Sequence, residues 1–176
     1  VNPREMVKLL ASETKRQAER KGMRVPRLIL ELGRIIVAEA GITLYTVGAV
    51  KVIPGVRTYV SIDGGMMDNP RASLYGAKYE ALIAGRADEK PAGTYAVAGR
   101  ACETGDVLGY DFRLPAPEVG DIIAVMTTGA YHHSMASNYN RVPMPAMVLA
   151  HYGKAELIVE RQCYDDLVRY DRVPGW

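Results

Sequence analysis

From Gly41 onward, short segments rich in Val, Ile, Thr and Tyr alternate with turns that contain Gly or Pro. These residue types favour strands, and the Gly and Pro positions favour tight turns between them. The segments are TLYTVGAVKVI, RTYVSID, TYAVAGRAC, DVLGYDFRL, DIIAVMTTGAY, PAMVLAHYG and KAELIVERQ. About seven strands at this spacing predict an antiparallel β-barrel or sandwich that occupies residues 41–176.

Two segments of this region depart from the strand pattern. Residues 69–85 are rich in helix formers and predict a long loop with a helical turn, a kind of insertion that often carries function. The C-terminal CYDDLVRYDRVPGW predicts one short amphipathic helix. In DVLGYDFRL the alternation is regular and predicts that four side chains face the core, those of Leu108, Tyr110, Phe112 and Leu114.

The first 40 residues carry a different pattern. Asn2 is placed to cap a helix, with Pro3 at its first position and Gly22 as the left-handed residue that ends it. The apolar run at 28–30 predicts a buried parallel strand, and Gly33 predicts a turn into a second helix. Residues 1–40 therefore predict a helix–strand–helix remnant of an α/β domain, which precedes a mainly β domain.

Composition limits the possible partners. The 176 residues include 22 Lys and Arg and 20 Asp and Glu, a formal charge of +2, so we expect neither nucleic-acid nor membrane binding. No segment approaches the roughly 20 apolar residues of a transmembrane helix. Cys102 and Cys163 cannot form a disulfide framework, which favours the reducing cytoplasm. Because the chain begins at Val1 rather than Met, we expect a fragment of a longer protein.

The segment ELGR, residues 31–34, lies where the predicted strand meets the second helix. Backbone amides at a helix start attract anions, and Gly33 would let a phosphate approach closely, with Glu31 and Arg34 beside it. The simpler interpretation of these four residues is a glycine turn next to a surface pair of opposite charges.

The segment SIDGGMMDNPRASLY, residues 61–75, concentrates residues that direct the backbone. One interpretation is a glycine-rich turn in which Met66 and Met67 fill a gap. The other is a binding loop that presents Arg71 to a carboxylate, with Tyr75 on the same helical face. The residue types favour both interpretations equally.

The segment TGAYHHSMASNYN, residues 128–140, places Tyr131 beside two histidines and several hydroxyl and amide side chains. Adjacent His132 and His133 point apart, and no third ligand follows at a suitable spacing. We therefore expect no metal site.

Cys102 begins the polar stretch CETGD, residues 102–106. A lone free cysteine is most often an inert part of a core. The polar neighbours instead indicate a turn between strands, which would expose the thiol and make it available for chemistry. A metal-ligand role lacks partners, and the other two interpretations stay open from these residues alone.

Four blocks of the sequence together resemble the C-terminal half of the bacterial diaminopimelate decarboxylase family. The blocks are ELGRIIVAEAGITLYTVGAVK, YVSIDGGMMDNPRASLYGAKYEA, GRACETGD and TTGAYHHSMASNYN. The resemblance covers essentially the whole chain. It implies a cytoplasmic, homodimeric pyridoxal 5′-phosphate enzyme of the alanine racemase-like fold, in which a β domain follows a (β/α)8 barrel. Such an enzyme converts meso-2,6-diaminopimelate to L-lysine and carbon dioxide.

The resemblance also implies roles for individual residues. Those that match the family's cofactor-binding positions are Glu31, Gly33, Arg34 and Tyr131, with Leu32 in place of the family's proline. Those that match its substrate-binding positions are Arg34, Arg71, Tyr75, Glu103 and Tyr131. Cys102 matches the catalytic cysteine, which together with Glu103 completes the neighbouring subunit's site. On this basis we expect the Cys102 thiol to be accessible to solvent.

The lysine that forms the Schiff base with the cofactor lies, in this family, in the N-terminal barrel. None of Lys51, Lys78 and Lys90 has a matching motif, so we expect that this chain alone does not decarboxylate a substrate. Two alternatives stay open. One is a related decarboxylase of basic amino acids or of the carboxynorspermidine type, and the other is a stand-alone dimerisation or binding module.

Overall fold

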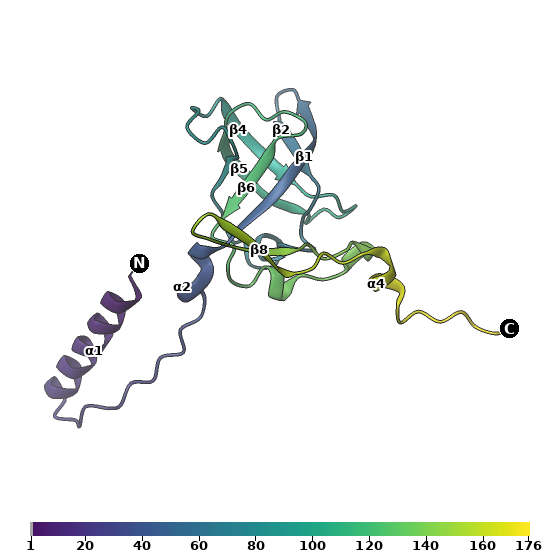
Figure 1. Ribbon diagram of the computed structural model, residues 1–176. Coiled ribbons are helices and arrows are strands. Elements are labelled where there is room, and N and C mark those ends of the chain that lie inside the picture. The colour runs from purple at the N-terminus through teal and green to yellow at the C-terminus, as the bar shows by residue number, and fades with distance from the viewer. Residues whose placement is uncertain (1) are drawn as a thin grey trace.

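The computed structural model describes residues 2–176, which form a curled six-stranded sheet, a two-stranded hairpin and a few helices (Figure 1). The strands are β1 (Ile42–Ile53), β2 (Arg57–Ile62), β3 (Ala81–Ile83), β4 (Gly93–Ala98), β5 (Val107–Leu114), β6 (Ile122–Met126), β7 (Met147–His151) and β8 (Lys154–Val159). The helices are α1 (Pro3–Arg20), α2 (Arg34–Val37), α3 (Arg71–Tyr75) and α4 (Tyr164–Val168), with 3-10 turns η1 (Ala38–Ala40), η2 (His133–Met135) and η3 (Tyr139–Arg141). The prediction of a mainly β fold is confirmed.

The six strands follow the order β3-β6-β1-β2-β4-β5. β1 bends between two partners: its first five residues pair with β6 and the rest with β2, with a bulge between Val47 and Ala49. β3 and β5, at the two ends of this order, contact each other, so the sheet is a nearly closed barrel.

One pair of strands corrects the antiparallel prediction. β2 and β4 are parallel, whereas every other pair among the described strands is antiparallel. A parallel pair needs a long crossover, and here residues 63–92 supply it. This crossover contains α3, so the predicted helical turn within 69–85 is confirmed. It also contains β3, which we did not predict because three residues are too few to show an alternation.

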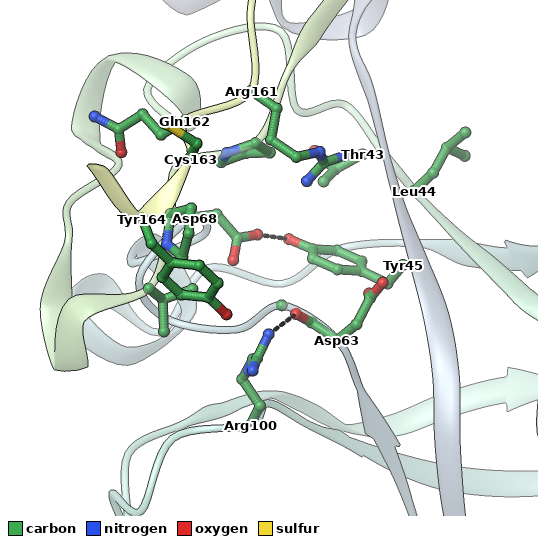
Figure 2. A pocket seen from close by; sticks show the side chains of 14 residues that line it. Thr43, Leu44, Tyr45, Asp63, Asp68, Arg100, Arg161, Gln162, Cys163 and Tyr164 are labelled. Atoms are coloured by element: carbon green, nitrogen blue, oxygen red, sulfur yellow. Dashed lines mark hydrogen bonds between the residues drawn. The ribbon is translucent and has the colours of Figure 1, made fainter. Parts of the chain in front are cut away.

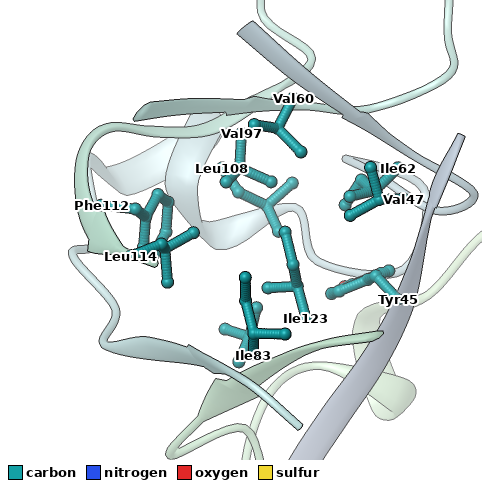
Figure 3. Packing of buried hydrophobic residues seen from close by; sticks show 11 residues of the cluster. Tyr45, Val47, Val60, Ile62, Ile83, Val97, Leu108, Phe112, Leu114 and Ile123 are labelled. Carbon is teal, nitrogen blue, oxygen red and sulfur yellow. The ribbon is translucent and has the colours of Figure 1, made fainter. Parts of the chain in front are cut away.

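The hydrophobic core fills the inside of the barrel (Figure 3). Its members come from β1 to β6, and they are Tyr45, Val47, Val60, Ile62, Ile83, Val97, Leu108, Phe112, Leu114, Ile123 and Val125. Three of the four inward-facing residues predicted in β5 belong to it. The exception is Tyr110, whose side chain is 49% exposed. The register of β4 and β5 shifts twice, between Tyr95 and Val97 and between Val97 and Ala98, and these bulges turn Tyr110 outward.

The first 40 residues agree only in part with the prediction. The Asn2 side chain accepts a hydrogen bond from the Arg4 N–H at 2.9 Å, as expected for an N-cap. At the other end Gly22 has φ +62°, and the N–H of Met23 reaches the carbonyl of Ala18 at 2.9 Å. α1 lies apart from the barrel (Figure 1), and Ala18 is its one buried residue.

The predicted buried strand at residues 28–30 is wrong for this chain. These residues form an extended segment, and Ile29 is 74% exposed. A parallel strand is stable only when neighbouring strands satisfy its backbone and cover its faces, and no described segment pairs with residues 28–30. The second helix is also short, because α2 passes into η1 after four residues.

The C-terminal segment confirms two predictions. β7 and β8 form an antiparallel hairpin outside the barrel sheet, and α4 is the short helix expected near the end of the chain. No helix within residues 2–176 is both long enough and apolar enough to cross a membrane.

Candidate functional site

Two segments that are far apart in the sequence cross at Gly41 and Gly129. The Gly129 N–H donates a hydrogen bond to the Ala38 carbonyl at 2.9 Å. A Cβ on Gly129 would lie 2.0 Å from the Val37 carbonyl oxygen, so a side chain there would force the two backbones apart. This close crossing brings Tyr131 to the turn that precedes α2.

Tyr131 lies directly against Gly33, the residue before α2. A Cβ on Gly33 would be 2.7 Å from the Tyr131 hydroxyl oxygen. Tyr131 itself has φ +64°, a conformation that costs energy for any residue with a side chain and that often occurs at binding sites. Its ring is nevertheless 43% exposed, so it can contact a ligand.

Arg71, the first residue of α3, lies between two aromatic rings. Its guanidinium carbon is 5.0 Å from the centre of the Tyr75 ring and 5.4 Å from the centre of the Tyr131 ring, within range for cation–π attraction. Its Nε is buried without a hydrogen-bond partner. Within residues 2–176 Arg71 forms no ion pair. A guanidinium held in this way is suited to bind a carboxylate.

Two further aromatic side chains, Tyr79 and His132, lie near this arginine. Their rings meet edge to face with centres 5.2 Å apart. Burial raises the pKa of Tyr79, against the positive charges of Arg71 and Arg34. Burial lowers the pKa of His132, which is 4% exposed and whose Nδ1 donates to the Ala130 carbonyl at 3.0 Å. Tyr79 is therefore a neutral phenol near pH 7 and does not compete with a ligand anion for Arg71, while His132 is a neutral imidazole that adds no positive charge beside it.

The turn that carries Cys102 forms around the buried carboxylate of Asp106. This carboxylate accepts hydrogen bonds from the N–H groups of Met66 and Ala101, both at 2.7 Å. A Cβ on Gly99 would lie 2.2 Å from it, so glycine is required there. Cys102 is exposed, which confirms the expected accessibility of its thiol.

Glu103, next to Cys102, has partners within its own chain. The Tyr139 hydroxyl donates to Glu103 Oε2 at 3.1 Å, and the Gly105 N–H donates to Oε1 at 3.4 Å. The Ser73 hydroxyl donates to the Gly105 carbonyl, which links this turn to α3.

The residues predicted from the sequence thus fall into two groups. Gly33, Arg71, Tyr75 and Tyr131 lie together, and the charge of Arg34 reaches the same region. Cys102 and Glu103 form a second group. No hydrogen bond or ion pair described within residues 2–176 joins Cys102 or Glu103 to the first group. Glu31 lies exposed in the extended segment before α2 and makes no such contact with either group.

Sequence reasoning missed three residues beside these groups. They are Tyr79 and His132 near Arg71, and Tyr139 beside Glu103. The polar crowding of residues 128–140 was the available signal for His132 and Tyr139, but within that segment only Tyr131 was predicted to be a site residue. No cluster of His, Cys, Asp or Glu that could hold a metal ion occurs in the described part of the chain.

A cavity lies elsewhere, between the start of β1 and the segments at 142–145 and 161–164 (Figure 2). Its volume is about 480 Å³, and none of the predicted site residues lines it. Tyr45 on its wall donates a hydrogen bond to Asp68. Burial raises the pKa of both groups, that of Tyr45 far above its usual value. This buried pair ties β1 to the segment 61–75, for which the sequence favoured a glycine-rich turn and a binding loop equally.

Comparison with known proteins adds an independent line of evidence. Residues 29–129 match the family model for the C-terminal sheet domain of pyridoxal-dependent decarboxylases. The chain is 49% identical to the diaminopimelate decarboxylase of Bacillus subtilis (strain 168) over 95% of its length, and 48% identical to that of Halalkalibacterium halodurans over 94%. It spans about 38% of the length of each of these relatives.

The fold gives the same result. The crystal structure of diaminopimelate decarboxylase from M. jannaschii in co-complex with L-lysine is 39% identical and superimposes with a TM-score of 0.79. The match covers 92% of this chain and 36% of that one. Because the family model covers more than half of the residues, the chain belongs to the pyridoxal-dependent decarboxylases and contains their C-terminal sheet domain.

Proposed function

We propose that this chain is the C-terminal part of an enzyme that converts meso-2,6-diaminopimelate to L-lysine and carbon dioxide. The observation that carries the proposal is the Arg71 guanidinium, which forms no ion pair within residues 2–176, has a buried Nε without a hydrogen-bond partner, and lies between Tyr75 and Tyr131. The names of the relatives and the L-lysine in the M. jannaschii structure support it. We further propose that residues 1–40 are the last unit of an N-terminal (β/α)8 barrel, since residues 28–30 lack neighbouring strands, and that residues 41–176 are the β domain.

The residues present fit pyridoxal phosphate. The backbone amides of Gly33 and Arg34, at the start of α2, would hold the phosphate, with Glu31 close by in the chain and the Tyr131 hydroxyl directly against Gly33. Tyr131 would lie beside the ring. When bound, the cofactor would act as an electron sink that stabilises the electron pair left on the substrate carbon after carbon dioxide departs. We propose that the lysine that binds the cofactor covalently lies in the N-terminal (β/α)8 barrel, outside this chain.

The substrate presents two charged groups for this chain to bind. A meso compound has one D and one L centre, and a product of L configuration keeps the L centre intact, so its carboxylate and ammonium are the distal groups. Arg71 and Arg34 would bind the distal carboxylate, with Tyr75 beside it. A site whose buried donors bind a carboxylate discriminates strongly against an analogue without one, because those donors are then left unpaired.

Cys102 and Glu103 would act in the other subunit of a homodimer. The Glu103 carboxylate would accept hydrogen bonds from the distal ammonium, and the Cys102 thiol would donate its proton to the carbon that has lost carbon dioxide. Two free cysteines also favour a cytoplasmic location.

The test uses the full-length protein that includes this chain. We expect it to release carbon dioxide from meso-diaminopimelate, and we expect Arg71→Ala to lower kcat/KM at least about 100-fold, because a buried charge-assisted pair is lost. Arg113→Ala, at an exposed arginine of β5, is the matched control and should change little.

A second substrate shows whether Arg71 acts through the carboxylate. D-lysine lacks the distal carboxylate, so its slow turnover should respond little to Arg71→Ala. A parent enzyme that prefers D-lysine to diaminopimelate would contradict the proposed substrate and favour a decarboxylase of basic amino acids.

A further inference from the structure

We propose that Tyr139 positions the carboxylate of Glu103 and thereby contributes to recognition of the substrate's distal ammonium group. The inference rests on the function proposed above, in which Glu103 binds that ammonium. Tyr139 would not touch the reacting atoms and acts only through Glu103.

The contact itself is specific to one oxygen atom. The Tyr139 hydroxyl donates to Oε2 of Glu103 at 3.1 Å, and the Gly105 N–H approaches Oε1 at 3.4 Å. A carboxylate has about four acceptor positions, so these two donors fix its orientation and leave lone pairs for an ammonium. Without the hydroxyl, an exposed glutamate would sample several rotamers.

The electrostatics agree with a donor role for the tyrosine. The hydrogen bond with Glu103, followed by the charge of that carboxylate, raises the pKa of Tyr139. The phenol therefore keeps its proton at neutral pH. Its donated hydrogen bond is directed at the Glu103 carboxylate, the group that would bind the distal ammonium.

The backbone around Tyr139 is held in an uncommon conformation. Asn140 and Arg141 both have φ +56°, and two successive residues of this kind persist only when surrounding contacts enforce them. Asn138 supplies one such contact, because its side-chain amide donates to the Val142 carbonyl at 3.0 Å and to Gln162 at 2.6 Å.

Arg141 supplies the second contact. Its guanidinium donates to the Leu167 carbonyl and to Asp171, both at 2.9 Å. These bonds fasten η3 to α4 and to the segment after it, which lie at the same end of the molecule (Figure 1). Tyr139 is therefore presented from a fixed turn, which is what a positioning residue requires.

The test compares two competitive inhibitors of the full-length enzyme. L-Lysine carries the distal amino group and 6-aminohexanoate lacks it, while both keep the distal carboxylate and the opposite amine. We expect Tyr139→Phe to weaken inhibition by L-lysine about 5-fold, the effect of one hydrogen bond, and to leave inhibition by 6-aminohexanoate unchanged. KM for diaminopimelate should rise by a similar factor with kcat nearly unchanged.

Two further variants make the result decisive. Glu103→Gln should weaken inhibition by L-lysine but not inhibition by 6-aminohexanoate. Adding Tyr139→Phe to the Glu103→Gln variant should weaken inhibition by L-lysine little further, because both substitutions act through one carboxylate. Tyr152→Phe, at an exposed tyrosine in the β7–β8 turn, is the control and should alter neither inhibitor.

Three outcomes would overturn the proposal. Tyr139→Phe could leave inhibition by L-lysine unchanged, it could weaken inhibition by both compounds equally, or it could weaken inhibition by L-lysine as much in the Glu103→Gln variant as in the parent. The proposed function is checked separately. If the parent enzyme neither decarboxylates diaminopimelate nor binds L-lysine, that function is wrong, whatever the variants do.

Discussion

β6 (IIAVM) and β8 (KAELIV) both contain apolar strand-forming residues, although β8 also carries Lys154 and Glu156, and the two strands have very different surroundings. In β6 both Ile123 and Val125 are 0% exposed, because the strand lies between β1 and β3 and faces the filled interior of the barrel (Figure 3). In β8 every residue is exposed, and Ile158 is 52% exposed, because the strand pairs only with β7. The residue pattern sets the strand conformation, but neighbouring strands decide whether its side chains are buried.

The extended segment at residues 28–30 also shows that burial depends on neighbouring strands. Its sequence LIL has the apolar character of a buried strand, yet it has no partner strand within residues 2–176. An apolar run of this kind is buried only where neighbouring strands cover it. The barrel strands, by contrast, find all their neighbours within this chain, and there the prediction is confirmed.

The largest difference between the two regions should appear on truncation of an isoleucine. Ile123→Ala removes a fully buried side chain and leaves a cavity, so the free energy of unfolding should fall by about 3 kcal/mol. Ile158→Ala makes the same change in the hairpin and should cost less than about 1 kcal/mol, since half of that side chain is already exposed. Urea titration of both variants measures the two values.

Equal losses for these variants would mean that the hairpin packs against a surface that this structure does not show. A small loss for Ile123→Ala would mean that the barrel interior rearranges to fill the cavity. The first result would weaken the contrast between β6 and β8, and the second would place the stable core elsewhere.

The same contrast applies to carboxylates that bind backbone amides. Asp106 is 2% exposed and accepts hydrogen bonds from two N–H groups. Asp106→Ala leaves both unpaired, so the free energy of unfolding should fall by about 2–3 kcal/mol. Asp63 accepts one N–H bond, from Thr46 at 2.8 Å, and is exposed. Asp63→Ala should therefore cost no more than about 1 kcal/mol.

Thiol chemistry gives the Asp106 prediction a second measurement. If Asp106 shapes the turn that carries Cys102, Asp106→Ala should also change the rate at which a water-soluble maleimide modifies Cys102, measured in a Cys163→Ser background. An unchanged rate together with an unchanged stability would show that this turn forms without its buried carboxylate.

The sequence predicts features whose cause lies within a few residues. The N-cap at Asn2, the left-handed Gly22 and the helical turn at α3 are of this kind, and all three are confirmed. The parallel pairing of β2 with β4 depends on contacts across a crossover, so no local pattern indicated it. Tyr110 faces outward because of two bulges in the register with β4, a property of two strands rather than one.

The site shows the same division. Arg71 and Tyr75, four residues apart on one short helix, could be associated from spacing alone. Their contact with Tyr131, and that of Tyr131 with Gly33, depends on the crossing of Gly41 and Gly129. Tyr139 and Glu103 are likewise joined only by the fold.

The smallest expected effect concerns two histidines, the buried His132 and His151 of the exposed hairpin, and the pH dependence of stability. Burial lowers the pKa of His132 in the folded chain, so between that value and the unfolded value near 6.5 the unfolded chain binds more protons. Stability should therefore fall as the pH decreases through 6.5, with a slope of at most about 1.4 kcal/mol per pH unit. His132→Phe keeps a ring beside Tyr79 and should reduce the difference between the unfolding free energies measured at pH 7.5 and pH 5.5. His151→Phe, in the exposed hairpin, should leave it as in the parent. If His132→Phe also leaves it unchanged, protons bind elsewhere in this range, and the buried imidazole beside Arg71 plays no part in the acid sensitivity of the fold.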